Sequence, residues 1–401
     1  MKENILIINN IEYHNYFKQG DIQNPIINPN KYNIFIFSDP RIKNTIPANL
    51  YNKLISIDFN DYELLLNQVK KIHSINPINH VITLKESTIL LGSIIRENLK
   101  IDNGLGINAA NIFRDKFLMK KTVERNSIKC PNFSKIQNYN ELMYFFQSYK
   151  KIVIKPRLGM GSQNTYIVSD KDSLDIAYKK IQHQLNDYIV EEFIAGDMYH
   201  IDSIVKNGEI KLVSISKYLN STLSYNNNST LSSVMINKDA LYNRLKHYNE
   251  AILNIMDYKN GISHLEIFVN NHNEIIFCEI AARSGGAGVV PSIEKAFSIN
   301  LYEAAICLEL DNPLPKIISN SLFYGWIIFF KKNGTVKNIK TEVLKQDWIC
   351  DYEIAVTPGE HTDVSKYSTD AAVSIILSGE SEETLTEHIN WLTKNFVIDY
   401  E

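Results

Sequence analysis

The sequence predicts an α/β protein that opens with a doubly wound parallel sheet, and the chain length and two apolar patterns support this prediction. The chain has 401 residues, more than one ordinary hydrophobic core holds, so we expect two or three domains. Apolar runs at residues 4–8, 32–37 and 80–84 have the composition of strands, and helical stretches at residues 62–73 and 88–98 lie around them. Strands that alternate with helices pair in parallel, so the opening unit should be an α/β domain.

Composition and charge exclude several classes of function. With 44% hydrophobic and 22% charged residues, the chain has the composition of a soluble globular protein. Its formal charge of -3 provides no electrostatic attraction to nucleic acid or to an anionic membrane. The apolar run near Met1 is too short for a signal peptide, and no other run is long enough for a membrane helix. We therefore expect a cytoplasmic protein with no nucleic-acid or membrane partner.

The four cysteines argue against two kinds of stabilising site. They are far apart and include no Cys-x-x-Cys pair. Zinc sites and disulfide frameworks both need cysteines that can be brought together in a defined pattern. We therefore expect neither.

The elements beyond residue 110 are a helix, several strands and a final helix. One helix is predicted from about residue 110 to 126, and Pro131 lies beyond its end. Strands are predicted at residues 151–156, 165–169, 188–194, 324–329 and 372–376. A helix at residues 382–394 should complete a small C-terminal α+β segment.

Two isolated carboxylates stand in neighbouring apolar runs. Glu266 and Glu279 are separated by the turn-rich residues 270–273, so an antiparallel hairpin would bring them side by side. Like charges on neighbouring strands repel unless something cationic lies between them. Two hard oxygen ligands suit Mg²⁺, which keeps waters and takes its other ligands from phosphates. For this segment alone, an amphipathic hairpin with solvated acids remains the alternative.

A glycine-rich turn and two lysines point to a phosphate site. Glycines at residues 159–162 would let backbone N–H groups approach an anion closely. The turn is neither a Walker loop, because no Gly-Lys-Ser/Thr opens a helix, nor a dinucleotide fingerprint, because a strand follows it. Lys155 ends the apolar strand before the turn and could neutralise phosphate oxygens, as could Lys116 from another element. For the glycines alone, a plain tight turn is the alternative.

Taken in order, these motifs resemble the ATP-grasp superfamily, and within it the carboxylate–amine ligases of the L-amino acid ligase type. The resemblance extends over nearly the whole chain. Its motifs are Asp115-Lys116, Lys155-Pro156 with residues 159–162, residues 190–196, residues 264–266 and residues 279–283.

The resemblance implies an ATP-grasp fold of two α+β subdomains between an N-terminal domain and a small C-terminal subdomain. The implied units are an N-terminal α/β domain at residues 1–110, a lid subdomain with the glycine-rich hairpin at 111–187, a core subdomain with the metal site at 188–312, and a C-terminal α+β subdomain at 313–401.

The resemblance also implies a role for each candidate site residue. Lys116 and Lys155 would hold the phosphates of ATP, and Gly161 and Ser162 would close over them. The hinge strand along the adenine would consist of Glu191, Glu192, Phe193 and Ile194. Mg²⁺, with Mn²⁺ as an alternative ion, would be held by Glu266 and Glu279, and the transferred phosphoryl group would contact Arg283.

The implied reaction is a ligation of two small molecules. A carboxylate, with an amino acid as the leading candidate, attacks the γ-phosphate of ATP to give an acyl-phosphate and ADP, and an amine then attacks the carbonyl. A ligase or carboxylase that acts on another carboxylate or on bicarbonate is one alternative, and a nucleotide-binding regulatory protein without turnover is another. A homodimer is the expected assembly if the protein is not a monomer. Residues 232–235 and 287–291 are expected to line the acceptor pocket.

Two positions depart from the pattern of the superfamily. Ala281 stands where many members have an asparagine that ligates metal. Met198 stands where a ribose-binding glutamate is common, and Asp197 or Asp202 could replace it. His200 could contact substrate, although a lone histidine in a strand is more often structural.

Overall fold

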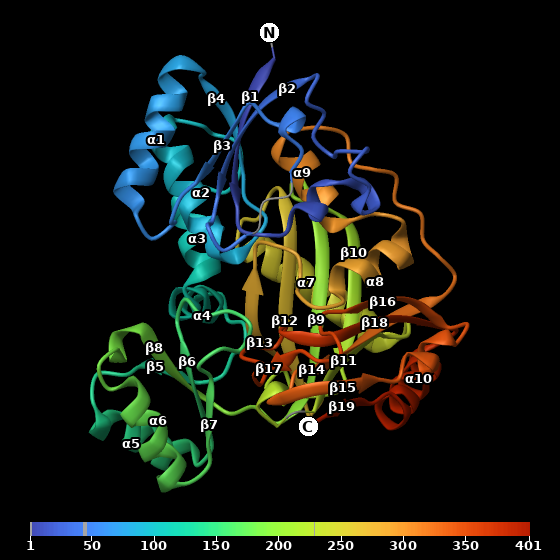
Figure 1. Ribbon diagram of the computed structural model, residues 1–401. Coiled ribbons are helices and arrows are strands. Elements are labelled where there is room, and N and C mark those ends of the chain that lie inside the picture. Colours follow the sequence, from blue (N-terminus) through green and yellow to red (C-terminus); the bar gives the residue numbers. More distant parts are fainter. Residues whose placement is uncertain (1, 43–45, 228) are drawn as a thin grey trace.

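The computed structural model describes residues 2–42, 46–227 and 229–401. The chain begins with a four-stranded parallel sheet in the order β3-β2-β1-β4, at the top of Figure 1. Its strands are β1 (Glu3–Asn9), β2 (Tyr32–Ser38), β3 (Lys53–Ser56) and β4 (Ile78–Ile82). Ile5 and Ile7 of β1 pack into one hydrophobic cluster, and Leu6 and Ile8 pack into another on the opposite face. This sheet is therefore buried on both faces, as expected of a parallel sheet.

Helices and short turns cover the two faces of this sheet. α1 (Tyr62–Ile75) and α2 (Glu86–Leu99) pack on one face. The other face is covered by the segment around the 3₁₀ helix Tyr13–Tyr16 and by α9 (Leu301–Glu309) from much later in the chain. The predicted fold class, an α/β opening followed by α+β units, is confirmed.

A small antiparallel sheet projects at the lower left of Figure 1. Its order is β5-β8-β6-β7, with β5 (Phe133–Lys135), β6 (Ile152–Pro156), β7 (Tyr166–Val168) and β8 (Tyr188–Glu192). α5 (Tyr139–Tyr149) and α6 (Lys171–Ile181) pack on it around one hydrophobic cluster of its own. We call this part of the molecule the small-sheet unit.

The centre of the molecule is an eight-stranded antiparallel sheet in the order β13-β12-β9-β10-β11-β14-β18-β16. Its strands are β9 (Gly196–Lys206), β10 (Glu209–Tyr218), β11 (Thr230–Met235), β12 (Gly261–Asn270), β13 (Ile275–Ala281), β14 (Phe323–Phe330), β16 (Ile349–Ile354) and β18 (Ala371–Gly379). A three-stranded sheet lies beside it and contains β15 (Gly334–Ile339), β17 (His361–Thr362) and β19 (Ile398–Tyr400). The domain boundaries stay a prediction, and the central sheet includes strands from both sides of residue 312.

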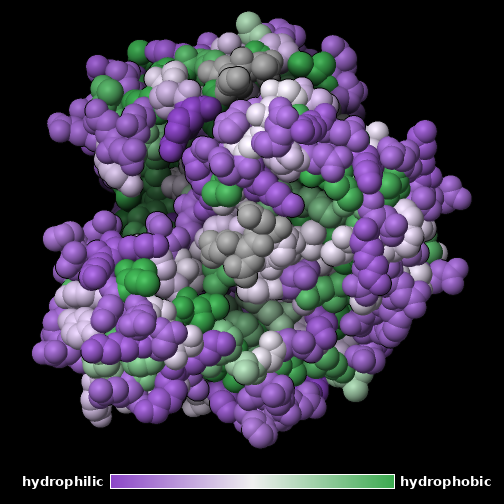
Figure 2. Space-filling view, turned by 60° about the horizontal axis from the view of Figure 1, so that its bottom comes forward, coloured by the Kyte–Doolittle hydropathy of each residue, from purple (hydrophilic) through white to green (hydrophobic). Residues whose placement is uncertain are grey.

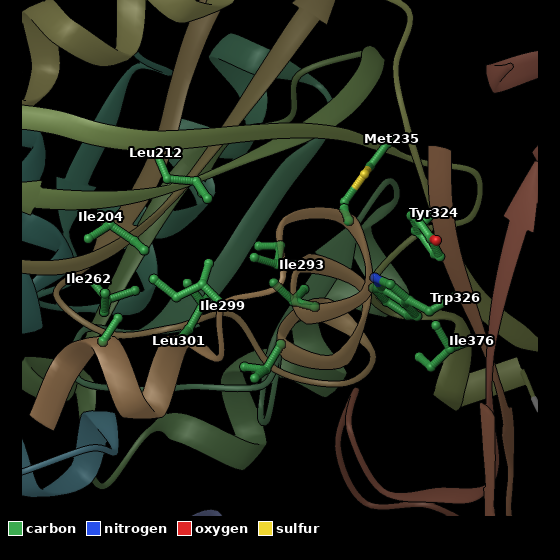
Figure 3. Close-up of a cluster of buried hydrophobic side chains, with 14 of the residues drawn as sticks. Ile204, Leu212, Met235, Ile262, Ile293, Ile299, Leu301, Tyr324, Trp326 and Ile376 are labelled. Atoms are coloured by element: carbon green, nitrogen blue, oxygen red, sulfur yellow. The ribbon is translucent and has the colours of Figure 1, made fainter. Parts of the chain in front are cut away.

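Helices bury both faces of the central sheet. On one face, α8 (Val289–Phe297) and α9 join the cluster shown in Figure 3, which includes Trp326. On the other face, α4 (Lys116–Arg125) and α7 (Ala240–Ile255) pack against alternate residues of β9 and β12. α10 (Glu382–Asn395) covers the strands near the C-terminus. The sheet that carries Glu266 and Glu279 is therefore held rigidly from both sides.

One predicted helix is wrong in its extent. The stretch from 110 to 126 forms two helices, α3 (Ile107–Arg114) and α4, which meet at Asp115. Asp115 has an extended backbone, and its carboxylate accepts a hydrogen bond from the N–H of Phe117. An aspartate that caps a helix in this way starts a new helix. The break makes Lys116 the first residue of α4.

The surface in Figure 2 is largely hydrophilic, with hydrophobic side chains visible inside a hollow. No helix in the described part of the chain is long and apolar enough to cross a bilayer.

Candidate active site

Two cavities meet at the β12–β13 hairpin. The first, of about 370 Å³, lies between the small-sheet unit and the central sheet. The second, of about 660 Å³, lies between the central sheet and the N-terminal sheet. Glu266, Glu279 and Tyr218 line both cavities, together with residues 160–163. Two compounds bound in the two cavities would therefore approach each other at the two glutamates.

The predicted hairpin is confirmed. β12 and β13 are antiparallel, and their register places Glu266 directly opposite Glu279. The protein itself supplies positive and hydrogen-bonding groups around this pair. Lys116 Nζ lies 3.1 Å from Glu279 Oε2, and the hydroxyl of Tyr218 donates to Glu266 Oε1 at 3.1 Å. Burial would raise the pKa of Glu279, but Lys116 and Lys155 lower it to about 2, so this carboxylate is ionised.

The two predicted phosphate-binding lysines lie beside the second glutamate. Lys155, which is 8% exposed, has its Nζ 3.0 Å from Glu191 Oε2 and 4.0 Å from Glu279 Oε2. Burial would lower the pKa of Lys155, but the charges of Glu191 and Glu279 raise it above its ordinary value. Lys116 Nζ also donates to the carbonyl of Gly159 at 2.9 Å. Both lysine side chains line the first cavity.

A third buried lysine was missed in the sequence. Lys120 is fully buried, donates to the carbonyl of Cys278 at 2.8 Å, and lies 3.4 Å from Glu191 Oε1. The side chain of Glu191 therefore points between two lysines rather than along the hinge strand. Lys120 follows Lys116 by four residues, so helical periodicity would have placed both on one face of the same helix.

The predicted hinge residues end β8 and line the first cavity. The N–H of Glu192 donates to the carbonyl of Asn132, and that of Phe193 donates to the carbonyl of Lys151. The Phe193 ring packs under Lys151 Nζ, 3.7 Å from the ring centre. Within the described residues, the N–H of Ile194 has no protein partner. It is therefore a free donor at the cavity wall.

The predicted glycine-rich turn reaches over both cavities. Gly161 has a φ of +59°, a conformation that favours glycine, and the next residue, Ser162, also has a positive φ. The carbonyl of Gly161 accepts the N–H of Ser368 at 3.0 Å, and the carbonyl of Ser162 accepts the hydroxyl of Tyr225 at 2.9 Å. These two hydrogen bonds tie the turn to Tyr225 and to Ser368, which lines the second cavity.

Arg283 lies on the side of the second cavity and is held by a residue that the sequence did not reveal. Glu86, at the start of α2, accepts from Arg283 Nε at 2.8 Å and also pairs with Arg114. Glu86 is 5% exposed; burial raises its pKa, but Arg283 and Arg114 lower the pKa overall. The N-terminal domain thereby fixes the position of a candidate catalytic arginine. No local pattern around Glu86 predicts this, because its partners are distant in sequence.

Asp197 and Asp202, the two residues predicted to replace the ribose-binding glutamate, lie in different surroundings. Asp202 is fully buried, and its two oxygens lie 2.7 Å from His200 Nδ1 and 2.7 Å from His264 Nδ1. Asp202 is therefore excluded as a ribose contact. Asp197 lines the first cavity, with Lys217 Nζ 2.7 Å from its carboxylate.

The buried histidines connect this network to a glutamate of the hairpin. His200 also lies 2.8 Å from the hydroxyl of Ser233, which fits a structural role. His264 Nε2 lies 3.5 Å from Glu266 Oε1, and His264 stands opposite Ala281 in the hairpin. The network of Asp202 and the two histidines thus contacts Glu266 through His264. It lies next to Ala281, the position at which many members of the superfamily have a metal-binding asparagine.

The predicted lining of the second cavity is partly wrong. Ala287 lines it, but Val289 and Val290 are buried in the core cluster where α8 begins. Residues 232–235 form part of β11 and are buried. Apolar residues in these runs pack against the sheet. The sequence pattern cannot distinguish an apolar residue that packs in the core from one that lines a pocket.

We expect the buried His264–Asp202 pair to make stability depend on pH. Burial would lower the pKa of His264, but Asp202 raises it from 6.5 to about 10. Above pH 6.5 only the folded state keeps this proton, so its contribution to stability decreases as the pH rises towards 10. Between pH 7 and pH 9, urea unfolding should show a loss of about 2 kcal/mol in the wild type that is absent in His264→Gln. His14→Gln, a change at an exposed histidine, should keep the wild-type dependence, whereas identical curves for all three proteins would contradict the assignment.

Comparison with known proteins identifies the domain around this site. Residues 148–291 match a family model described as an ATP-grasp domain. Over these residues the chain is similar to an ATP-grasp domain. This domain contains the glycine-rich turn, the hinge residues, the glutamate hairpin and Arg283, and its recognition from the sequence motifs is confirmed.

Relatives extend the similarity beyond the ATP-grasp domain. The chain is 26% identical to an L-arginine-specific L-amino acid ligase of Bacillus subtilis over 349 residues, 84% of each chain. The crystal structure of an L-amino acid ligase from Bacillus licheniformis superposes with a TM-score of 0.79 at 17% identity, covering 100% of this chain and 99% of the other. The predicted resemblance to L-amino acid ligases is confirmed.

Another structure that is similar to this chain was solved with ligands. The biotin carboxylase domain of the Hydrogenobacter thermophilus 2-oxoglutarate carboxylase, in complex with MgADP, ADP and bicarbonate, has a TM-score of 0.69 at 12% identity. The comparison covers 100% of this chain and 91% of that domain. Proteins of this fold therefore include nucleotide- and Mg²⁺-binding enzymes.

Proposed function

We propose that this chain is an ATP- and Mg²⁺-dependent ligase that joins the carboxylate of an amino acid to an amine and releases ADP and phosphate. The observation that supports this most directly is the meeting of the two cavities at Glu266 and Glu279, with the lysines on one side and Arg283 on the other. ATP in the first cavity would direct its terminal phosphate toward a carboxylate in the second.

The first cavity offers the adenine and the phosphates of ATP chemically suitable partners. The free N–H of Ile194 would donate to the adenine ring. Lys155 and Lys116 would neutralise the phosphates, which would replace Glu279 as their counter-charge. Gly161 and Ser162 would then cover the phosphates from above.

The donor set fits Mg²⁺. Glu266 and Glu279 present carboxylate oxygens from adjacent strands at the junction of the two cavities, and Glu279 is ionised. When bound there, Mg²⁺ would supply a Lewis acid that offsets the charge of the transferred phosphoryl group. Mn²⁺ takes the same kind of ligand and is proposed as a substitute. With Ala281 in place of an amide ligand, water would complete the coordination.

Arg283 would serve the second cavity. Its guanidinium can contact the carboxylate under attack and then the acyl-phosphate, whose negative charge it would stabilise. The backbone of residues 284–287 follows it along the cavity wall and offers N–H donors for the oxyanion that forms when the amine attacks. The volume of about 660 Å³ accommodates an amino acid and an amine together and is far larger than bicarbonate requires. A homodimer and cytoplasmic localisation stay predictions.

Product analysis tests this proposal. We expect the purified protein, incubated with ATP, Mg²⁺ and pairs of amino acids that include L-arginine, to release ADP and phosphate in amounts equal to the dipeptide formed. Metal and arginine at the terminal phosphate direct attack to the γ-phosphorus, so AMP and pyrophosphate should be absent. Nucleotide chromatography and mass spectrometry of the dipeptide measure both products, and omission of either amino acid is the control. AMP as the stoichiometric product would overturn the acyl-phosphate route.

A further inference from the structure

The base of the glycine-rich turn is held by the junction of α3 and α4. Arg114 Nη2 donates to the carbonyl of Leu158 at 2.6 Å. The backbone N–H of Lys116 donates to the carbonyl of Arg157 at 3.0 Å, and Lys116 Nζ donates to the carbonyl of Gly159 at 2.9 Å. Three consecutive carbonyl groups at the base of the turn are therefore held by Arg114 and Lys116.

Arg114 also connects the turn to the arginine of the second cavity. Arg114 is 8% exposed, and its Nη1 donates to Glu86 Oε1 while its Nη2 holds Leu158. The other oxygen of Glu86 accepts from Arg283 Nε at 2.8 Å. Hydrogen bonds between ionised groups are stronger than neutral ones and fix the geometry of both partners. A continuous path of contacts thus leads from the turn over the first cavity to Arg283 in the second.

A bound nucleotide would change the contacts at the start of this path. The Lys116 ammonium group donates to the carbonyl of Gly159 and lies 3.1 Å from Glu279 Oε2. Phosphates would take over this ammonium group, so the carbonyl of Gly159 would lose its donor and the turn would settle on the phosphates. Leu158 directly precedes Gly159. Because Arg114 is buried among closely packed groups, it would have to follow a shift of the Leu158 carbonyl.

We propose that Arg114 is a positioning residue that couples the two cavities, so that nucleotide bound under the turn fixes Arg283 for the carboxylate substrate through Arg114 and Glu86. The inference rests on the proposed ligase function and goes beyond it. Once phosphates hold the turn, Arg114 and Glu86 are already ordered, and a carboxylate that binds Arg283 no longer has to restrict them. The nucleotide should therefore raise the affinity of the second cavity for the carboxylate. By linkage, the carboxylate should raise the affinity for the nucleotide by the same factor.

Hydrogen exchange on the full-length protein tests this coupling, with Mg·ADP as the probe. ADP lacks the terminal phosphate that is assigned to Arg283, and residues 84–87, all described in the structure, line the second cavity but not the first. In the wild type, Mg·ADP should slow the exchange of residues 84–90 by roughly 5-fold or more, together with that of residues 157–164. In Arg114→Met the turn should still be protected, but the exchange of residues 84–90 should stay within about 2-fold of the nucleotide-free rate.

Two further variants separate the link through Arg114 from other effects. Arg157→Met removes another guanidinium at the base of the turn, one that has no contact with Glu86 in the described part of the chain. It should keep the response of residues 84–90. Arg114→Lys keeps a positive charge beside Glu86, so it preserves the fold if Arg114→Met does not. Its single nitrogen replaces two that hold Glu86 and Leu158 separately, so most of the response at residues 84–90 should be lost.

The outcomes separate the coupling from the proposed function. Arg114 does not couple the cavities if Mg·ADP protects only the turn in the wild type, or if either Arg114 variant responds at residues 84–90 like the wild type. Loss of the response in Arg157→Met would also overturn the role of Arg114, because any disturbance of the turn would then suffice. If Mg·ADP protects neither segment, the nucleotide site is wrong, and the proposed function fails together with the coupling. If the coupling is found but no pair of amino acids causes release of ADP, only the ligase is overturned.

Discussion

Replacing Glu279 with glutamine is expected to lower the rate of ADP release by roughly 100- to 1,000-fold while the protein stays folded. Glutamine has the same size but no charge, so it loses the interaction with Mg²⁺ and the counter-charge for Lys116. Glu279 stands at the junction of both cavities and is ionised with a pKa of about 2, so its charge is present at every working pH. The rate is measured at saturating ATP across a series of Mg²⁺ concentrations, with circular dichroism as the check on folding.

Glu274→Gln is a matched control in the same hairpin. Glu274 pairs with Lys129 at 2.7 Å on the exposed surface and lines neither cavity. An exposed ion pair of this kind contributes little, so this variant should keep wild-type turnover. If Glu279→Gln also kept normal activity and an unchanged response to Mg²⁺, Glu279 would have no place at the metal.

The parts of the site that the sequence predicted are those built from adjacent strands. Glu266 and Glu279 are separated by one turn, so the apolar runs around them define the hairpin, and the hairpin defines their pairing. Lys155 could be placed in the same way, because it ends a strand immediately before the glycine-rich turn. Asp115 could have been predicted in part. An aspartate that precedes a helix is a signal for the start of that helix, but hydrophobic periodicity alone does not show this signal.

The parts that could not be predicted depend on tertiary contacts between distant segments. Asp202 is a single acid in an apolar strand, and only the alignment of β9 beside β12 brings it to His264. Val289 and Val290 lie close to Arg283 in sequence, yet α8 turns them into the core. Whether such residues face a cavity or a core is decided by how layers pack, which no short sequence window contains.

Among the residues whose role depends on contacts between distant segments, Glu86 is the clearest example. Replacing Glu86 should have the largest effect on stability. Its carboxylate neutralises Arg114 and Arg283 in a site where Glu86 is 5% exposed. Glu86→Gln would leave two arginines without their counter-charge, which should lower the free energy of unfolding by about 3 kcal/mol. It should also lower turnover, because Arg283 would no longer be held at the second cavity. Urea unfolding and ADP release measure the two effects.

Two further variants distinguish charge neutralisation from a general defect in α2. Glu97→Gln changes an exposed glutamate on the same helix and should alter stability by less than about 0.5 kcal/mol. Adding Arg114→Met to Glu86→Gln removes one of the two uncompensated charges, so stability should partly recover. Turnover should stay low in this double variant, because Arg283 still lacks the carboxylate that positions it. If Glu86→Gln is as stable as Glu97→Gln, Glu86 does not hold the two arginines in place.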